Sequence, residues 1–112
     1  MLEAYEQYVK DNWNQNGKPW ADDELGRLKS LYIMATGLAG ETGEVQEHLK
    51  KYVRDGYMDV DKLKLELGDV LHYLTRICQQ FNLDLQAVAE ANMDKLDRRF
   101  GRKTQERQDS GC

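Results

Sequence analysis

Two pairs of acidic residues have the types and the spacing needed for metal chemistry. They are Glu41-x-x-Glu44 and, after a gap of 21 residues, Glu66-x-x-Asp69. On a helix, residues three apart lie on one face about a turn from each other, so each pair presents two carboxylates together. Carboxylates that converge from two helices offer only oxygen ligands, which suit Mg²⁺ or Mn²⁺ better than Zn²⁺ or copper. The spacing therefore predicts a divalent metal site.

The second acidic pair lies beside an apolar seam. At about 100° per residue, Glu66 falls about 60° and Asp69 about 120° from the direction of that seam, on the side that also carries Tyr73. Carboxylates in such a position face a groove between helices, where they repel one another and where a divalent cation would compensate their charge. The seam repeats with alternating spacings of four and three residues, which is typical of helix packing, and consists of Leu63, Leu67, Val70, Leu74, Ile77 and Phe81.

Cationic residues accompany the acidic pairs. Lys51 follows Glu44 by seven residues and shares its side of the helix, while Asn92 lies on the apolar face of the last expected helix with Lys95 and Arg99 beside it. Together with metal ions, Lys and Arg side chains form an electrostatic clamp for a polyphosphate, and the chain has no glycine-rich phosphate loop to do this instead. The alternative is that Asn92 is satisfied by the backbone and that Lys95 and Arg99 are solvated near a helix C-terminus.

Four helices are expected to position these residues. Asp22 or Asp23 and Asp84 are candidate N-caps, and Gly56 ends the second helix. Glycines inside that helix each cost about 1 kcal/mol relative to Ala, so we expect an interruption near Gly37 or the close approach of a neighbouring group. The expected helices cover residues 2–13, 22–54, 60–81 and 85–100.

The expected fold is all-α, with about four helices in one domain over residues 1–100 and a mobile tail over residues 101–112. One chain offers few helices to cover both the apolar seam and the apolar face of the preceding helix. We therefore expect a helical bundle that is completed by homo-oligomerisation, at least to a dimer.

Composition excludes several classes of protein. A net charge of −4 and a pI near 5.2 argue against a general nucleic-acid binder, and no apolar run approaches the ~20 residues of a membrane span. We expect no signal peptide. Cys78 lies inside a helical pattern and Cys112 is the last residue, so neither is placed for a structural disulfide, which indicates a reducing, cytoplasmic location. Cys78 is expected in the core and His72 on the exposed side of its helix.

Three segments of the chain resemble the MazG-like, all-α nucleoside triphosphate pyrophosphohydrolase superfamily. The resemblance extends over about residues 31–99 and follows the family pattern of E-x-x-E, a gap, E-x-x-D and a later basic helix. With one acidic module, the chain resembles the short single-domain members and not the tandem ones. The segments are GLAGETGEVQEHLKKYVRDG (residues 37–56), ELGDVLHYL (residues 66–74) and NMDKLDRRF (residues 92–100).

The resemblance implies an enzyme that hydrolyses (deoxy)nucleoside triphosphates to the monophosphate and pyrophosphate. It also implies a dimer or a dimer-based tetramer with sites near subunit interfaces. Lys95 and Arg99, with Asn92, would grip the phosphates. The residues that it implies as ligands of Mg²⁺, for which Mn²⁺ can substitute, are Glu41, Glu44, Glu66 and Asp69.

Specific roles follow for several of these residues. Either Glu41 or Glu44 is able to orient or deprotonate the attacking water, and Glu47 is a supporting acid whose structural alternative is an ion pair with Lys51. Lys51 would join the phosphate contacts. Tyr73, four residues after Asp69, is a candidate base or sugar contact or, equally, an aromatic at the edge of the core.

Two other kinds of protein remain open at this stage. One is a nucleotide-binding regulatory protein that keeps the acidic site without efficient turnover, and the other is a purely structural helical bundle. Convergence of the carboxylates would exclude the structural bundle, whereas only a turnover assay separates the first alternative from an enzyme.

Overall fold

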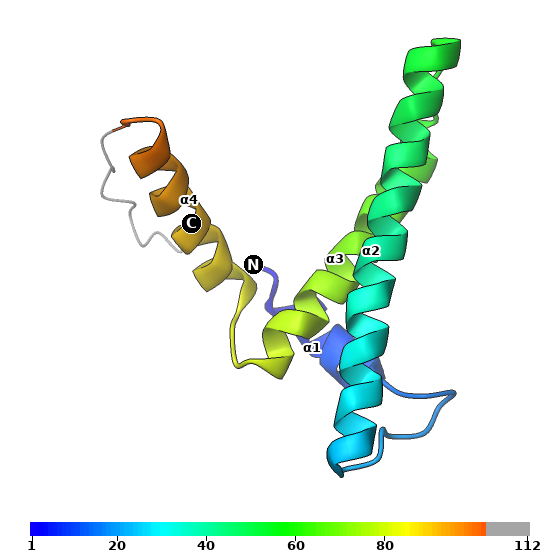
Figure 1. Ribbon diagram of the computed structural model, residues 1–112, viewed down its shortest axis with the longest axis vertical. Coiled ribbons are helices and arrows are strands. Elements are labelled where there is room, and N and C mark those ends of the chain that lie inside the picture. The colour runs from blue at the N-terminus through cyan, green and yellow to red at the C-terminus, as the bar shows by residue number, and fades with distance from the viewer. Residues whose placement is uncertain (103–112) are drawn as a thin grey trace.

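The computed structural model describes residues 1–102 and contains four α-helices within that range (Figure 1). Within these residues the β pairing is limited to a single bridge between Gln15 and Lys18. The expectation of an all-helical chain with about four helices is confirmed. Most of the expected tail, from residue 103 onward, lies outside the described residues. The helices are α1 (Glu3–Asn12), α2 (Glu24–Asp55), α3 (Val60–Gln80) and α4 (Leu85–Arg99).

Short-range hydrogen bonds explain where these helices begin and end. The side chains of Asp23, Asp59 and Asp84 each accept a hydrogen bond from a backbone N–H three residues on, at 2.7, 3.1 and 2.6 Å, so each is an N-cap. Gly56, at φ 77°, ends α2 and donates its N–H to the Tyr52 carbonyl at 2.7 Å. Such a left-handed C-cap favours glycine. The helix boundaries therefore lie close to those expected from the sequence.

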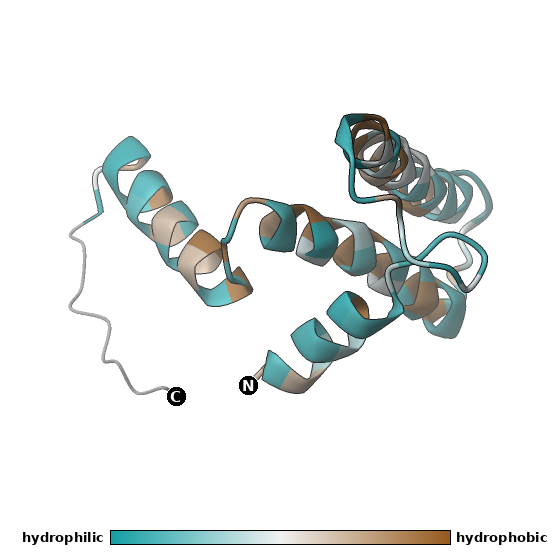
Figure 2. Ribbon diagram, turned by 90° about the horizontal axis from the view of Figure 1, so that it is seen from below, coloured by the Kyte–Doolittle hydropathy of each residue, from teal (hydrophilic) through white to brown (hydrophobic). Residues whose placement is uncertain are grey.

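Helices α2 and α3 form a long antiparallel hairpin, and α1 packs across the base of α3 (Figures 1 and 2). The buried core lies where these three helices meet, because that is where each apolar face has a neighbour. One side chain from each helix fills it, namely Val9, Met34 and Cys78, and Thr75 is buried among them. Cys78 is therefore in the core, as expected, and its thiol is free.

Helix α4 diverges from the hairpin (Figure 1). The turn before it contains Asn82 at φ 56°, and Leu83 donates its N–H back to the Cys78 carbonyl at 2.8 Å, a Schellman-type ending for α3. After this turn, Leu85 is buried and its N–H reaches a carboxylate oxygen of Glu6 at 3.3 Å. The described contacts thus attach α4 at its first turn, and its remaining length does not pack extensively on α2 or α3.

Helix α2 continues without interruption through its internal glycines for 32 residues, so the expected break near Gly37 is wrong. The other expectation, the close approach of a neighbouring group, is the one observed: the ring of Tyr73 on α3 lies against the backbone at Gly37, where a Cβ would overlap it. Close helix packing at Gly37 compensates for its poor helix propensity. Gly40 and Gly43 face open space, so no packing compensates for their low helix propensity.

Replacing Gly37 by Ala is expected to destabilise the fold, whereas Gly40→Ala should stabilise it. An added methyl group at Gly37 would meet three ring atoms of Tyr73, the farthest of them at 2.6 Å, and such overpacking costs about 1–3 kcal/mol. At Gly40 nothing lies within 4 Å of the added Cβ. The free energy of unfolding should therefore rise by about 1 kcal/mol, the difference in helix propensity between Ala and Gly. Urea denaturation measures both free energies of unfolding. Equal stabilisation by the two substitutions would contradict the close contact at Gly37.

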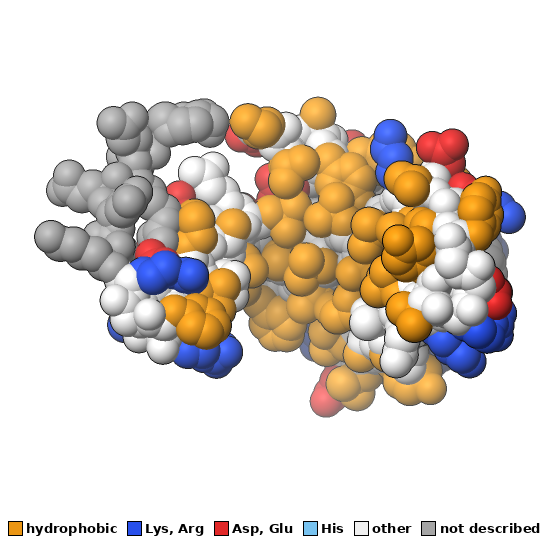
Figure 3. Space-filling view, turned by 90° about the horizontal axis from the view of Figure 1, so that it is seen from above, with side chains coloured by type: hydrophobic (Ala, Val, Ile, Leu, Met, Phe, Trp, Pro, Cys, Tyr) orange, Lys and Arg blue, Asp and Glu red, His pale blue; other side chains and the backbone are white. Residues whose placement is uncertain are grey.

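The apolar seam of α3 is only half covered within one chain. Leu63, Val70 and Ile77 are half-buried, but Leu67, Leu74 and Phe81 are 49%, 36% and 61% exposed. The face seen in Figure 3 likewise shows hydrophobic side chains spread over the surface of the hairpin region. The seam therefore has two edges. The edge with Leu63, Val70 and Ile77 packs within the chain, whereas the edge with Leu67, Leu74 and Phe81 stays exposed. Separately, no helix in the described range is both long enough and apolar enough to cross a bilayer.

Candidate metal centre

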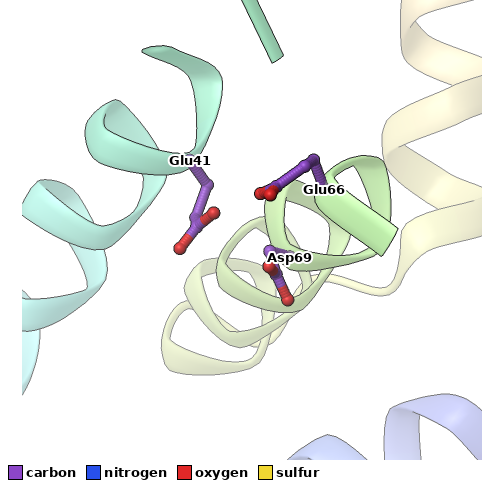
Figure 4. A group of neighbouring side chains, drawn as sticks. All are labelled: Glu41, Glu66 and Asp69. Carbon is purple, nitrogen blue, oxygen red and sulfur yellow. The ribbon is translucent and has the colours of Figure 1, made fainter. Parts of the chain in front are cut away.

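Three carboxylates from two helices converge in the groove of the α2–α3 hairpin. One oxygen each from Glu41 of α2 and from Glu66 and Asp69 of α3 lie within 4.8 Å of one another. Figure 4 shows Glu41 on α2 facing Glu66 and Asp69 on α3 across the groove. We call these three residues the acidic cluster. Antiparallel packing produces it, because it places the middle of α2 level with the first half of α3.

The electrostatics of the acidic cluster show charge that is poorly compensated. Burial, and then the negative charges of Asp69 and Glu66, raise the pKa of Glu41 above its ordinary value of 4.5. Among residues 1–102, no Lys or Arg forms an ion pair with any of the three carboxylates; the nearest basic group is His48, whose Nε2 lies 3.8 Å from a Glu66 oxygen. Three neighbouring carboxylates without a Lys or Arg partner repel one another, and a bound cation would compensate their charge.

The donor set fits a hard divalent cation. All three candidate ligands are carboxylate oxygens, which Mg²⁺ and Mn²⁺ prefer. Opposite ligands of an octahedral Mg²⁺ ion stand about 4.2 Å apart, given bond lengths of about 2.1 Å, so the 4.8 Å spread requires only small side-chain rotations. Glu41 and Glu66 are half-buried and Asp69 is exposed, which leaves one side of the acidic cluster open to solvent.

Glu44, the fourth acid of the sequence pattern, stands apart from the acidic cluster. It is exposed and lies one turn beyond Glu41 on α2, and the group of carboxylates within 4.8 Å does not include it. Glu47 is also exposed, and its carboxylate lies 3.8 Å from the Lys50 ammonium. The ion pair that the sequence suggested between Glu47 and Lys51 therefore gives way to an i, i+3 pair with the preceding lysine.

An aromatic cluster borders the acidic cluster on the side of α1. The rings of Trp13 and Tyr73 meet edge to face with centroids 6.1 Å apart, and His72 lies 4.9 Å from Tyr73 and 5.8 Å from Trp13. His72 is half-buried, so the expectation of an exposed side chain is wrong. The segment after α1 folds Trp13 over this side of α3, an arrangement that the periodicity of α3 alone does not reveal.

Hydrogen bonding favours a structural role for Trp13. Its indole N–H donates to the Ser30 hydroxyl at 2.8 Å, its ring stacks with Trp20 at 6.1 Å, and the Arg76 guanidinium lies 5.7 Å from its centroid. These contacts anchor the loop between α1 and α2. Tyr73 is held in the groove by the same packing, one turn from Asp69, so its ring forms a wall of the site as well as an edge of the core.

The basic residues of the sequence pattern are divided between two places. Lys51 is exposed on α2, toward the tip of the hairpin. Asn92, Lys95 and Arg99 are exposed on α4, which lacks extensive packing on α2 or α3. The structure therefore does not bring these α4 side chains to the acidic cluster of their own chain. The direction that the turn at Asn82 gives to α4 is the physical reason.

Sequence reasoning missed two residues beside the acidic cluster. His48 lies seven residues after Glu41, which is two helical turns, so the same periodicity that grouped the acids could have found it. Tyr5 of α1 also comes near, since burial, and then the charge of Asp69, raise the pKa of its phenol. No local signal identifies Tyr5, because only the packing of α1 across α3 places it there.

Comparison of the sequence with known proteins assigns it to a family. The sequence profile of the MazG nucleotide pyrophosphohydrolase domain matches residues 29–102, which contain both acidic pairs together with Lys51, Asn92, Lys95 and Arg99. The chain belongs to this family. The Gene 37 protein of Mycobacterium phage L5 is 35% identical over 80 residues, which cover 67% of this chain and 70% of the phage protein. No solved structure matches the chain. The expected family resemblance is thereby confirmed.

Proposed function

We propose that this MazG-family protein hydrolyses (deoxy)nucleoside triphosphates to nucleoside monophosphate and pyrophosphate in a Mg²⁺-dependent reaction. The observation that supports this most directly is the convergence of Glu41, Glu66 and Asp69 from two helices. It supplies an all-oxygen ligand set at the positions of the E-x-x-E and E-x-x-D motifs. The unpaired negative charge argues against a purely structural bundle, because such a group would cost folding free energy without a ligand.

The four acids take two roles in this proposal. Glu41, Glu66 and Asp69 hold the divalent ions, which supply phosphate polarisation and a water of lowered pKa when bound. Glu44 is exposed and lies outside the acidic cluster, one turn from Glu41, and orients and deprotonates the attacking water. Glu47 is a supporting acid that adds negative charge on the same side of α2 as Glu44. Tyr73 borders the sugar or base of the substrate.

In this proposal the basic residues bind the phosphates, and a second copy of the chain supplies some of them. Lys51 belongs to the same hairpin as the acidic cluster, whereas Asn92, Lys95 and Arg99 sit on the diverging helix α4. We propose that α4 of one protomer delivers these side chains to the acidic cluster of its partner in a homodimer or dimer-based tetramer. Burial of the exposed seam residues of α3 would stabilise that assembly. The free thiol of Cys78 fits a protein that works in the reducing cytoplasm.

The decisive assay is a panel of ribo- and deoxyribonucleoside triphosphates with Mg²⁺, followed by separation of the phosphorus-containing products. Monophosphate and pyrophosphate should appear together without a diphosphate intermediate, and EDTA should stop their formation. Orthophosphate with accumulating diphosphate would show attack at a different phosphorus. Tight Mg²⁺-dependent nucleotide binding without any turnover would favour the alternative of a nucleotide-binding regulatory protein.

Replacing Glu41 by Gln is expected to stabilise the metal-free protein. A carboxyl group whose pKa is raised in the folded state favours folding below its ordinary pKa, and that contribution is lost as the pH rises through the raised value. At pH 7 the ionised Glu41 is therefore a cost, and Glu41→Gln in EDTA should unfold a few degrees above wild type. With Mg²⁺ at about 100 times its Kd, wild type should gain about 2.7 kcal/mol and Glu41→Gln much less. Scanning calorimetry tests this, and equal Mg²⁺-induced shifts would exclude Glu41 as a ligand.

A further inference from the structure

A cavity lined by charged side chains of both signs lies at the tip of the α2–α3 hairpin. It has a volume of about 240 Å³ and opens between the end of α2 and the start of α3. The three acids of the acidic cluster lie outside its lining, and His48 links the two regions. Its lining includes His48, Lys51, Asp55, Tyr57, Asp59 and Lys62.

The two acids of this cavity have hydrogen-bond partners, whereas its two lysines form no ion pair within 4 Å in the described part of the chain. The Arg54 hydrogen bond, and further the charge of Lys51, lower the pKa of Asp55. Both oxygens of Asp55 accept from the Arg54 guanidinium at 2.9 Å, and Asp59 caps α3 by accepting from the Lys62 backbone N–H at 3.1 Å. Among residues 1–102, no carboxylate lies within 4 Å of the ammonium group of Lys51 or Lys62. The cavity therefore offers two ammonium groups that are available to an anion.

Three links tie this cavity to the acidic cluster. His48 lines the cavity, and its Nε2 lies 3.8 Å from a carboxylate oxygen of Glu66. Lys62 precedes Glu66 by one helical turn, about 6 Å along α3. Lys51 follows His48 by three residues, about 4.5 Å along α2. An anion that bridges from the acidic cluster toward the hairpin tip would therefore meet both lysines.

The groove has a different character on the opposite side of the acidic cluster. Gly37 and Tyr73 each lie one turn from an acid, about 6 Å in the direction away from the hairpin tip. The Tyr73 ring lies against Gly37 there, with Trp13 and His72 packed beside it. The groove thus runs from ammonium groups, through carboxylates, to aromatic rings. This order matches the order of leaving phosphates, metal-bound phosphate and nucleoside in a triphosphate substrate.

We propose that the hairpin-tip cavity binds the terminal phosphates of the substrate, which become the pyrophosphate leaving group, and that Lys62 together with Lys51 makes the contacts. The nucleoside then extends toward Tyr73. This inference rests on the proposed function and adds to it a direction of substrate binding and a residue, Lys62, outside the motifs. The cavity selects triphosphates over diphosphates, because a diphosphate leaves one ammonium group without a partner.

Lys62→Ala tests the proposal against Lys64→Ala, a matched change of an exposed lysine on the same helix. We expect Lys62→Ala to lower kcat/KM for triphosphates about 10- to 100-fold, on the scale of losing one charged contact to the leaving group. The discrimination between triphosphate and diphosphate should fall with it, and Lys62→Arg should restore part of the activity. Lys64→Ala should remain at wild-type values. Wild-type kinetics for Lys62→Ala, or equal losses in both variants, would overturn the proposal.

Binding of inorganic pyrophosphate separates this inference from the proposed function. Titration calorimetry with Mg²⁺ and pyrophosphate should give an affinity that falls at least 10-fold in Lys62→Ala and is unchanged in Lys64→Ala. If the nucleotide panel shows no hydrolysis but this difference persists, the hydrolase proposal fails and the anion cavity stands. If hydrolysis proceeds while pyrophosphate binds equally to both variants, the cavity assignment is wrong and the hydrolase proposal stands.

Discussion

Asp69→Asn is expected to abolish both Mg²⁺ binding and nucleotide hydrolysis while the helical content persists. Asp69 is one of three carboxylates within 4.8 Å, and its neutral amide keeps the size of the side chain but removes the charge that a hard cation requires. We expect a fall in kcat/KM of at least about 1000-fold, because both the phosphate polarisation and the activated water depend on the ion. Calorimetric Mg²⁺ titration and the product assay measure the two losses, and circular dichroism measures helicity.

Glu44→Gln is the informative contrast to Asp69→Asn. Because Glu44 lies outside the acidic cluster, this variant should keep Mg²⁺ affinity within a few-fold of wild type and yet lose kcat by about 100- to 10,000-fold, the scale of a general base. Glu90→Gln, an exposed acid on α4, serves as the control and should behave as wild type. Loss of Mg²⁺ affinity in Glu44→Gln would identify Glu44 as a fourth ligand. Full activity of a Glu44→Gln/Asp69→Asn double variant would disprove the metal site.

Lys95→Ala and Arg99→Ala are each expected to lower kcat/KM by about 10- to 1000-fold, since their contacts with a polyphosphate strengthen as charge develops on the leaving group. Both residues are one turn apart on α4, which diverges from the acidic cluster of its own chain. The proposal that they act across a dimer predicts complementation. Mixed dimers of the Asp69→Asn chain with the Lys95→Ala/Arg99→Ala chain should recover about a quarter of wild-type activity, because half of the dimers contain one intact composite site.

The matched control for complementation combines two chains that are both damaged in the acidic cluster, Asp69→Asn and Glu66→Gln. No site in such a mixed dimer has an intact cluster, so activity should stay at the level of the single variants. Sedimentation at micromolar concentration should show at least a dimer of the 13.0 kDa chain. A fully active monomer, or a mixture of the first pair that recovers nothing, would show that α4 does not act across subunits.

The sequence alone was sufficient to place the ends of the helices and the acidic pair of α3. Aspartates at 23, 59 and 84 and Gly56 delimit the helices through hydrogen bonds within a few residues, so local chemistry is sufficient to place them. The i, i+3 spacing likewise placed Glu66 and Asp69 on one face, since helical periodicity is a property of the chain segment itself. Family membership also follows from these segments.

The tertiary structure decided which of these side chains meet. Helical periodicity gives a direction around an axis but neither the separation of two helices nor their relative shift, so it could not show that Glu44 stays apart while His48 approaches Glu66. The direction of α4 depends on the turn at Asn82, which separates Lys95 from the acidic cluster. The contact of Tyr73 with Gly37 joins two helices at a point that periodicity could not identify, because it depends on how α2 and α3 are placed relative to each other.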